Sequence, residues 1–149
     1  MKISIGFDHG ALSLREALIP YLQENGHELV DHGTDSPESV DYPDYSRAVC
    51  EDIQNGRAEY GILCCTTGIG MSMSANKFPG VRAALVRYED EAALTRRHNN
   101  ANVLCLGALH TTAYEARRLA DAFISNAFEG GRHARRVGKF NDWEQQETP

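Results

Sequence analysis

Short apolar runs alternate with amphipathic helical patterns along the whole chain, and this alternation limits the possible folds more than any other feature of the sequence. Most of the runs are apolar almost throughout, as strands buried on both faces must be. The candidate strands are residues 3–7, 28–31, 60–65, 82–86 and 103–106. Repeated strand–helix units build a parallel sheet through right-handed crossovers. The sequence therefore predicts an α/β fold with a doubly wound, five-stranded parallel sheet and helices on both faces.

The helical patterns between the runs complete this prediction. Helices are expected over residues 12–25, 48–54, 89–98 and 113–127. The first ends at Gly26, and glycine suits the position just after a helix. The chain has 149 residues, a length typical of one domain, and contains no internal linker or repeat. We expect a single domain over residues 1–149.

Composition and charge exclude several classes of function. Hydrophobic residues make up 42% of the chain and the net charge is −6, which argues against a general affinity for nucleic acid or anionic lipid. No apolar run approaches the ~18 residues of a membrane span. The first apolar run ends at Asp8 and is too short for a signal peptide. We expect no nucleic-acid partner and no membrane association.

The four cysteines point to a reducing compartment. They contain no C-x-x-C pair, so the sequence supports neither a zinc site nor thioredoxin-type chemistry. Cys64 and Cys65 are adjacent on a predicted strand and should point to opposite faces. We expect free thiols and a cytoplasmic location. Cys50, Cys64 and Cys105 are expected to be small buried apolar residues.

The turn after the third strand is the expected place for chemistry, because ligands of open parallel sheets bind beyond the carboxyl ends of the strands. Cys65 ends that strand, and two threonines, Gly68, an isoleucine and Gly70 follow it. Residues 71–76 can begin a helix, whose free N–H groups attract anions. A thiol beside such groups has its thiolate form stabilised. Cys65 is therefore a candidate base or nucleophile.

Three well-known motifs do not fit this turn. A cysteine phosphatase needs an arginine at the sixth position after its cysteine to clamp phosphate, and that position is Met71. A Walker A loop needs lysine directly after its last glycine, but Met71 follows Gly70. A dinucleotide-binding fingerprint follows the first strand, whereas Gly68 and Gly70 follow the third.

Polar residues at two other places are candidates as well. Asp8 and His9 follow the first strand, and His98 and Asn99 end the helix before the fifth strand. Histidine is the side chain most suited to proton transfer near neutral pH. His9 and His98 are therefore candidate site residues, although each could instead be a hydrogen-bonded surface or core histidine, and Asp8 and Asn99 are the polar residues beside them.

The densest positive patch of the chain lies in its tail. Arg132 and Arg136 are spaced one helical turn apart and would face the same way. Two guanidinium groups on one face suit a phosphate dianion. In an otherwise acidic chain, this cluster is a candidate phosphate site, although it could equally be a solvated charge run.

These residues together resemble the ribose-5-phosphate isomerase B family, which includes the galactose-6-phosphate isomerase subunits. The matching segments are residues 8–10, 41–43, 61–70, 75–77, 80–84, 98–103 and 129–133. They extend from the first strand to the tail, so the resemblance covers nearly the whole chain.

The resemblance implies an aldose–ketose isomerase that uses no metal and no cofactor. In such an enzyme Cys65 would remove the proton from C2 of an open-chain sugar phosphate. Thr67 and the backbone amides from Gly68 to Gly70 would hold the enediolate oxygen. His98 would open the furanose ring as a general acid or base.

The resemblance also assigns the substrate contacts. The residues that would contact the sugar are Asp8, Tyr42 and Asn99. The residues that would hold the phosphate are His9, Arg132 and Arg136. Sites in this family are built from two chains, so the resemblance implies a homodimer or a pair of dimers, with the tail from about residue 130 at the subunit interface.

Three departures from the family pattern bear on the substrate. The family usually has glycine in the place of Thr66, and many members have arginine in the place of Leu109. Some members use a glutamate as base in the place of Met71, so this chain favours the cysteine route. Ribose 5-phosphate is the expected substrate. The alternatives are a four- or six-carbon sugar phosphate, a non-catalytic phosphate-binding module, and a subunit that requires a different partner chain.

Overall fold

The structure of the chain is a computed structural model that describes residues 1–146, so the last three residues of the expected 1–149 domain lie outside it. Five parallel strands form one sheet in the order β2-β1-β3-β5-β4. The strands are β1 (Lys2–Phe7), β2 (Glu28–Asp31), β3 (Tyr60–Cys65), β4 (Ala83–Leu85) and β5 (Val103–Gly107). This arrangement confirms the predicted parallel sheet.

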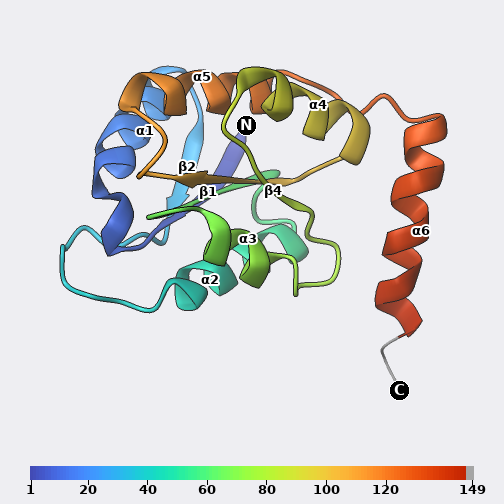
Figure 1. Cartoon of the computed structure of the whole chain (residues 1–149), viewed down its shortest axis with the longest axis horizontal. Coiled ribbons are helices and arrows are strands. Elements are labelled where there is room, and N and C mark those ends of the chain that lie inside the picture. The colour runs from blue at the N-terminus through green and yellow to red at the C-terminus, as the bar shows by residue number, and fades with distance from the viewer. Residues whose placement is uncertain (147–149) are drawn as a thin grey trace.

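Helices cover both faces of the sheet, as Figure 1 shows. One layer contains α1 (Leu12–Glu24), α4 (Glu89–Asn99) and α5 (Ala113–Ile124), and the other contains α2 (Tyr42–Gln54) and α3 (Ile69–Ala75). A short 3-10 helix (His9–Ala11) precedes α1. The predicted doubly wound α/β fold is confirmed. No helix within residues 1–146 is long and apolar enough to cross a membrane.

The sheet separates two hydrophobic cores, and β3 contributes to both. Ile62 and Cys64 pack in the core under α1, α4 and α5, whereas Leu63 and Cys65 pack in the core under α2 and α3. This follows from the strand geometry, in which successive side chains point to opposite faces. Cys64 and Cys65 thus lie on different faces as predicted, and all four cysteines are free thiols.

The last helix, α6 (Arg132–Gln146), lies beyond the β4 edge of the sheet and outside both helical layers (Figure 1). Gly130 and Gly131 precede it with φ of 70° and 58°, a left-handed turn that glycine adopts at least cost. Near its other end, the carboxylate of Glu144 accepts a hydrogen bond from the amide of Gly80 at 2.9 Å. A cavity of about 440 Å³ is lined by Phe140 and Trp143 of α6 together with residues of the rest of the chain, among them Val81 and Arg82.

Candidate active site

Cys65 ends β3, and the turn that follows it directs a backbone amide at its sulfur. The amide of Gly68 donates a hydrogen bond to Sγ of Cys65 at 3.1 Å. Gly68 has φ of 76°, and a Cβ added there would lie 2.5 Å from Cδ1 of Leu85 and 2.9 Å from the carbonyl carbon of Leu106. Only glycine satisfies both the backbone conformation and the space. A glycine is therefore required at this position to bring the amide donor to the Cys65 thiol.

The start of α3 supplies further donors beside the thiol. The helix begins at Ile69, two residues earlier than the sequence predicted, with Gly68 as its N-cap. The first N–H groups of a helix, including that of Gly70, have no acceptor within the helix. Oγ1 of Thr67 accepts a hydrogen bond from the amide of Ile69 at 3.3 Å. Gly70 lies against the ring of Tyr42, because an added Cβ would be 2.6 Å from its Cζ.

The end of β1 lies next to this turn. The amide of Asp8 donates to the carbonyl of Cys64 at 3.1 Å, and Oδ1 of Asp8 accepts from the amide of Gly10 at 2.9 Å. A Cβ on Gly10 would lie 2.0 Å from Oγ1 of Thr66, so the threonine that departs from the family pattern packs over Gly10. Nδ1 of His9 accepts a hydrogen bond from the amide of Val40 at 3.1 Å. In the neutral ring this contact places the proton on Nε2, which is then a donor.

The four thiols differ in their surroundings. Cys65 is 5% exposed, whereas Cys50, Cys64 and Cys105 are fully buried. Burial raises the pKa of Cys50 to about 11, and it raises the pKa of Cys64 and of Cys105 further. These three behave as the small apolar residues that the sequence predicted. Cys65 belongs to the α2–α3 core as well, but it is the cysteine that lies at the carboxyl end of a strand.

The remaining predicted site residues lie at the other end of the sheet. His98 and Asn99 end α4, which returns from the carboxyl end of β4 to the amino end of β5. The pairing of β3 with β5 places Gly61 beside Val103 at that amino end and Cys65 beside Gly107 at the carboxyl end. Four residues of strand correspond to about 13 Å. Within one chain, His98 therefore lies at the amino ends of the strands and Cys65 at their carboxyl ends.

The predicted phosphate-binding arginines also lie away from Cys65. Arg132 and Arg136 are exposed on α6, and residues 1–146 provide no ion-pair partner for either side chain. The structure thus divides the predicted residues into two groups. The first lies around Cys65 and contains Asp8, His9, Tyr42, Thr67, Gly68 and Gly70. The second contains His98, Asn99, Arg132 and Arg136.

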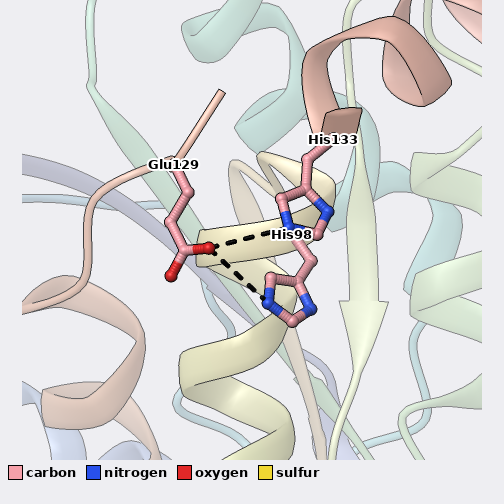
Figure 2. A group of neighbouring side chains, drawn as sticks. All are labelled: His98, Glu129 and His133. Atoms are coloured by element: carbon pink, nitrogen blue, oxygen red, sulfur yellow. Dashed lines mark ion pairs between the residues drawn. The ribbon is translucent and has the colours of Figure 1, made fainter. Parts of the chain in front are cut away.

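His98 belongs to a compact cluster with two residues of the tail (Figure 2). Its ring stacks on that of His133, with ring centroids 4.1 Å apart and planes 9° apart. Nε2 of His98 and Nε2 of His133 lie 3.8 and 3.6 Å from the same carboxylate oxygen of Glu129. The ligand atoms lie within 4.8 Å of one another, a spacing that could hold a metal ion. However, lone pairs in nearly parallel rings do not converge on one point, so metal binding would require one ring to turn.

Two charges define the electrostatics of this cluster. A hydrogen bond from Arg97 to Glu129, at 2.6 Å, lowers the pKa of that carboxyl group. Burial lowers the pKa of His133, and the neighbouring His98 and Arg132 lower it further. The cluster therefore combines an ionised carboxylate with a buried imidazole that resists protonation.

Comparison with known proteins decides the family. Residues 3–140 match the family described as ribose/galactose isomerase. The chain belongs to the ribose/galactose isomerase family. Ribose-5-phosphate isomerase B of Escherichia coli is 40% identical over 136 residues, which cover 91% of each chain. These matches confirm the predicted family and the predicted enzyme class, a sugar phosphate isomerase.

Solved structures of family members have the same fold. Ribose-5-phosphate isomerase B of Clostridium thermocellum is 42% identical, with a TM-score of 0.97 over 99% of this chain and 100% of the other. The enzyme of Mycoplasma genitalium, whose structure contains bound ribulose 5-phosphate, is 42% identical, with a TM-score of 0.92 over 99% and 97% of the two chains.

Proposed function

We propose that this member of the family interconverts ribose 5-phosphate and ribulose 5-phosphate through a cis-enediolate, with Cys65 as the base and without a cofactor. The observation that carries the proposal is the turn after β3. It combines a thiol, an amide directed at that thiol and the free amides at the start of α3. The bound ribulose 5-phosphate in the Mycoplasma genitalium relative favours a five-carbon substrate.

The isomerisation step requires one base and one oxyanion site. The thiolate of Cys65 takes the proton from C2 of the open-chain aldose, the electron pair forms a C1–C2 double bond, and the carbonyl oxygen becomes an oxyanion. The thiol then returns the proton to C1, and the proton of the C2 hydroxyl passes to O1, which leaves the carbonyl at C2. Backbone donors directed at such an oxyanion are commonly the largest contribution to catalysis. In this chain the amide of Gly70 and the hydroxyl of Thr67 are the candidates.

Ring opening precedes this step for a cyclic substrate. His98 donates a proton to the ring oxygen as the bond from that oxygen to C1 breaks. The C1 hydroxyl gives its proton to water as the carbonyl forms, and His98 regains a proton from solvent. Within one chain His98 lies at the opposite end of the strands from Cys65. The proposal therefore requires a second copy of the chain to bring its His98 to the Cys65 turn. A homodimer, or a pair of dimers, is the assembly that provides this, with the tail from about residue 130 at the interface.

Sugar and phosphate contacts come from both groups of residues. We assign Asp8, Tyr42 and Asn99 to the sugar. His9, with its Nε2 available as a donor, contributes to the phosphate site from the Cys65 side. The phosphate site is completed by Arg132 and Arg136, supplied with His98 by the second copy.

Leu109 stands where many family members have arginine, so the number of carbons in the substrate has to be tested. Its amide donates to the carbonyl of Thr66 at 2.9 Å, so an uncharged, 64% exposed residue lies beside the Cys65 turn. The second candidate function is therefore the same reaction on a four- or six-carbon sugar phosphate. The free thiols favour a reducing compartment, and we propose a cytoplasmic location.

A coupled isomerisation assay across four-, five- and six-carbon aldose phosphates tests the proposal. Ribose 5-phosphate should give the highest kcat/KM, and a chelator should leave that value unchanged. A preference for a six-carbon substrate would replace the proposed substrate with galactose 6-phosphate or allose 6-phosphate. Loss of activity with chelator would contradict the metal-free mechanism.

A further inference from the structure

His98 is held between two residues of the tail that have no role in the reaction described above. His133 is buried, with only 7% of its side chain exposed, while 34% of the His98 side chain is exposed. Nε2 of His133 has no hydrogen-bond partner within residues 1–146. A buried polar atom without a partner costs free energy, so its position calls for a reason other than stability.

The stack limits the motion of the His98 ring. An exposed histidine at a helix end samples several rotamers, and a flat ring 4.1 Å away and nearly parallel restricts both side-chain torsions. The ring that imposes this restriction is itself fixed by burial in the first turn of α6. His133 also resists protonation, so the stack carries little like-charge repulsion.

Glu129 fixes the second direction of the ring. Its amide donates to the carbonyl of Arg97 at 3.0 Å, and its carboxylate accepts from the Arg97 guanidinium, so both ends of the residue are tied to α4. The carboxylate faces Nε2 of His98 at 3.8 Å, the range of a charge contact rather than a hydrogen bond. Figure 2 shows the other ring nitrogen of His98 on the edge that faces away from Glu129.

We infer that Glu129 and His133 are positioning residues for His98, which hold its imidazole in one orientation with one nitrogen toward Glu129 and the other presented outward to the substrate. The inference rests on the proposed ring-opening role of His98. A positioned acid must be held closely, because a displacement of about 1 Å costs roughly 100-fold in rate.

The test compares turnover in the two directions of the reaction. Ribose 5-phosphate is mainly cyclic and needs ring opening, whereas ribulose 5-phosphate is acyclic and does not. Glu129→Gln and His133→Ala should lower kcat about ten-fold with the cyclic aldose and less than about two-fold with the acyclic ketose. His133→Phe keeps a flat ring and should retain most of the aldose rate. Adding either change to His98→Asn should cause no further loss, because the residues act through one group.

Glu89→Gln is the matched control. Glu89 is also a carboxylate paired with an arginine, Arg118, and lies at the other end of the same helix as His98. This variant should leave both directions unchanged. Proton NMR of the His98 ring gives an independent readout, because loss of the stacked ring in His133→Ala should shift its resonances, whereas His133→Phe should retain a ring-current shift.

Three outcomes distinguish the positioning inference from the proposed ring-opening role of His98. If Glu129→Gln and His133→Ala lower kcat equally in the two directions, or add to the loss of kcat from His98→Asn, the residues are merely structural and the inference is overturned. If His98→Asn shows the directional difference and the tail variants do not, only the positioning inference fails. If His98→Asn itself lowers kcat equally in the two directions, the proposed ring-opening role fails and the positioning inference fails with it.

Discussion

The amide nitrogen of Gly68 lies 3.1 Å from the sulfur of Cys65, three residues earlier in the chain. The left-handed backbone at Gly68 makes this contact possible. The proposed base and the turn beside it therefore depend on one glycine.

Gly68→Ala should damage both stability and activity. The added Cβ would meet Leu85 and the backbone of Leu106 within 3 Å, in addition to about 1–2 kcal/mol of left-handed strain. Gly80→Ala is the control, because Gly80 has φ of 78° but no atom within 4 Å of an added Cβ. Urea unfolding should show a loss for Gly68→Ala about twice that for Gly80→Ala, and kcat should fall in Gly68→Ala alone. Equal losses of stability would show that the site tolerates the side chain.

Cys65→Ala should abolish isomerisation, because a positioned general base contributes about 100- to 10,000-fold. Binding of a phosphate-containing product analogue, measured by calorimetry, should change little, since the phosphate contacts lie elsewhere. Cys50→Ala removes another thiol from the same hydrophobic core and should keep its kcat despite lower stability. Retained turnover in Cys65→Ala would remove the proposed base.

Arg136→Ala should raise KM for a sugar phosphate by roughly 10- to 100-fold, because a hydrogen bond to a charged group contributes about 1.5–3 kcal/mol. Arg135→Ala removes another exposed charge from the neighbouring position of α6 and should change KM by less than about two-fold. Steady-state kinetics of the two variants separate a specific contact from a general loss of positive charge. Equal changes in KM would place the phosphate elsewhere.

The sheet could be predicted from the sequence because its strands are marked by continuous apolar runs, and the predicted bounds of β3 agree with the structure. The start of α2 was missed, since the prediction began at residue 48 and the helix begins at Tyr42. Pro43 was an available signal, because proline favours the first turn of a helix. The polar stretch before it gave no apolar periodicity to mark that turn.

The long-range contacts of His98 could not be predicted from the sequence. His133 and Glu129 lie more than thirty residues from His98 in the chain, and no spacing rule connects them. The separation of His98 from Cys65 was predictable in principle, because a helix between parallel strands returns to the amino end of the sheet. The sequence places His98 at the end of the helix before the fifth strand, as the structure has it, and the structure adds that this end of α4 lies at the opposite end of the strands from Cys65.

Asp52 is a second group that only the structure reveals. It is 2% exposed and accepts hydrogen bonds from Ser4 at 2.7 Å, from His32 at 2.6 Å and from Arg57 at 2.7 Å. Burial alone would raise the pKa of Asp52, but these three donors outweigh burial and lower it. This network ties β1 and the segment after β2 to the end of α2.

The network should make stability depend on acid pH. Because the pKa of Asp52 is lower in the folded state than in the unfolded state, its contribution is present above about pH 4 and is lost as the pH falls below that value. Asp52→Ala should lower the free energy of unfolding by about 3 kcal/mol at pH 7 and flatten its decline toward pH 2. Urea titrations at several pH values measure both effects. Glu51→Gln, at the exposed neighbouring position, should keep the wild-type profile, and an unchanged profile in Asp52→Ala would show that the network contributes nothing.

The central claim is that one active site combines Cys65 of one chain with His98 of another. Mixing two variants that each lack one of these groups tests it most directly. Cys65→Ala and His98→Asn are unfolded together, refolded, and assayed with cyclic ribose 5-phosphate. Cys65→Ala refolded with the double variant Cys65→Ala/His98→Asn is the control and should stay inactive. In a dimer of unlike chains, one of the two sites keeps both groups, so random pairing should restore about one quarter of wild-type activity. Activity no greater than that of the separate variants would contradict a site shared between two chains.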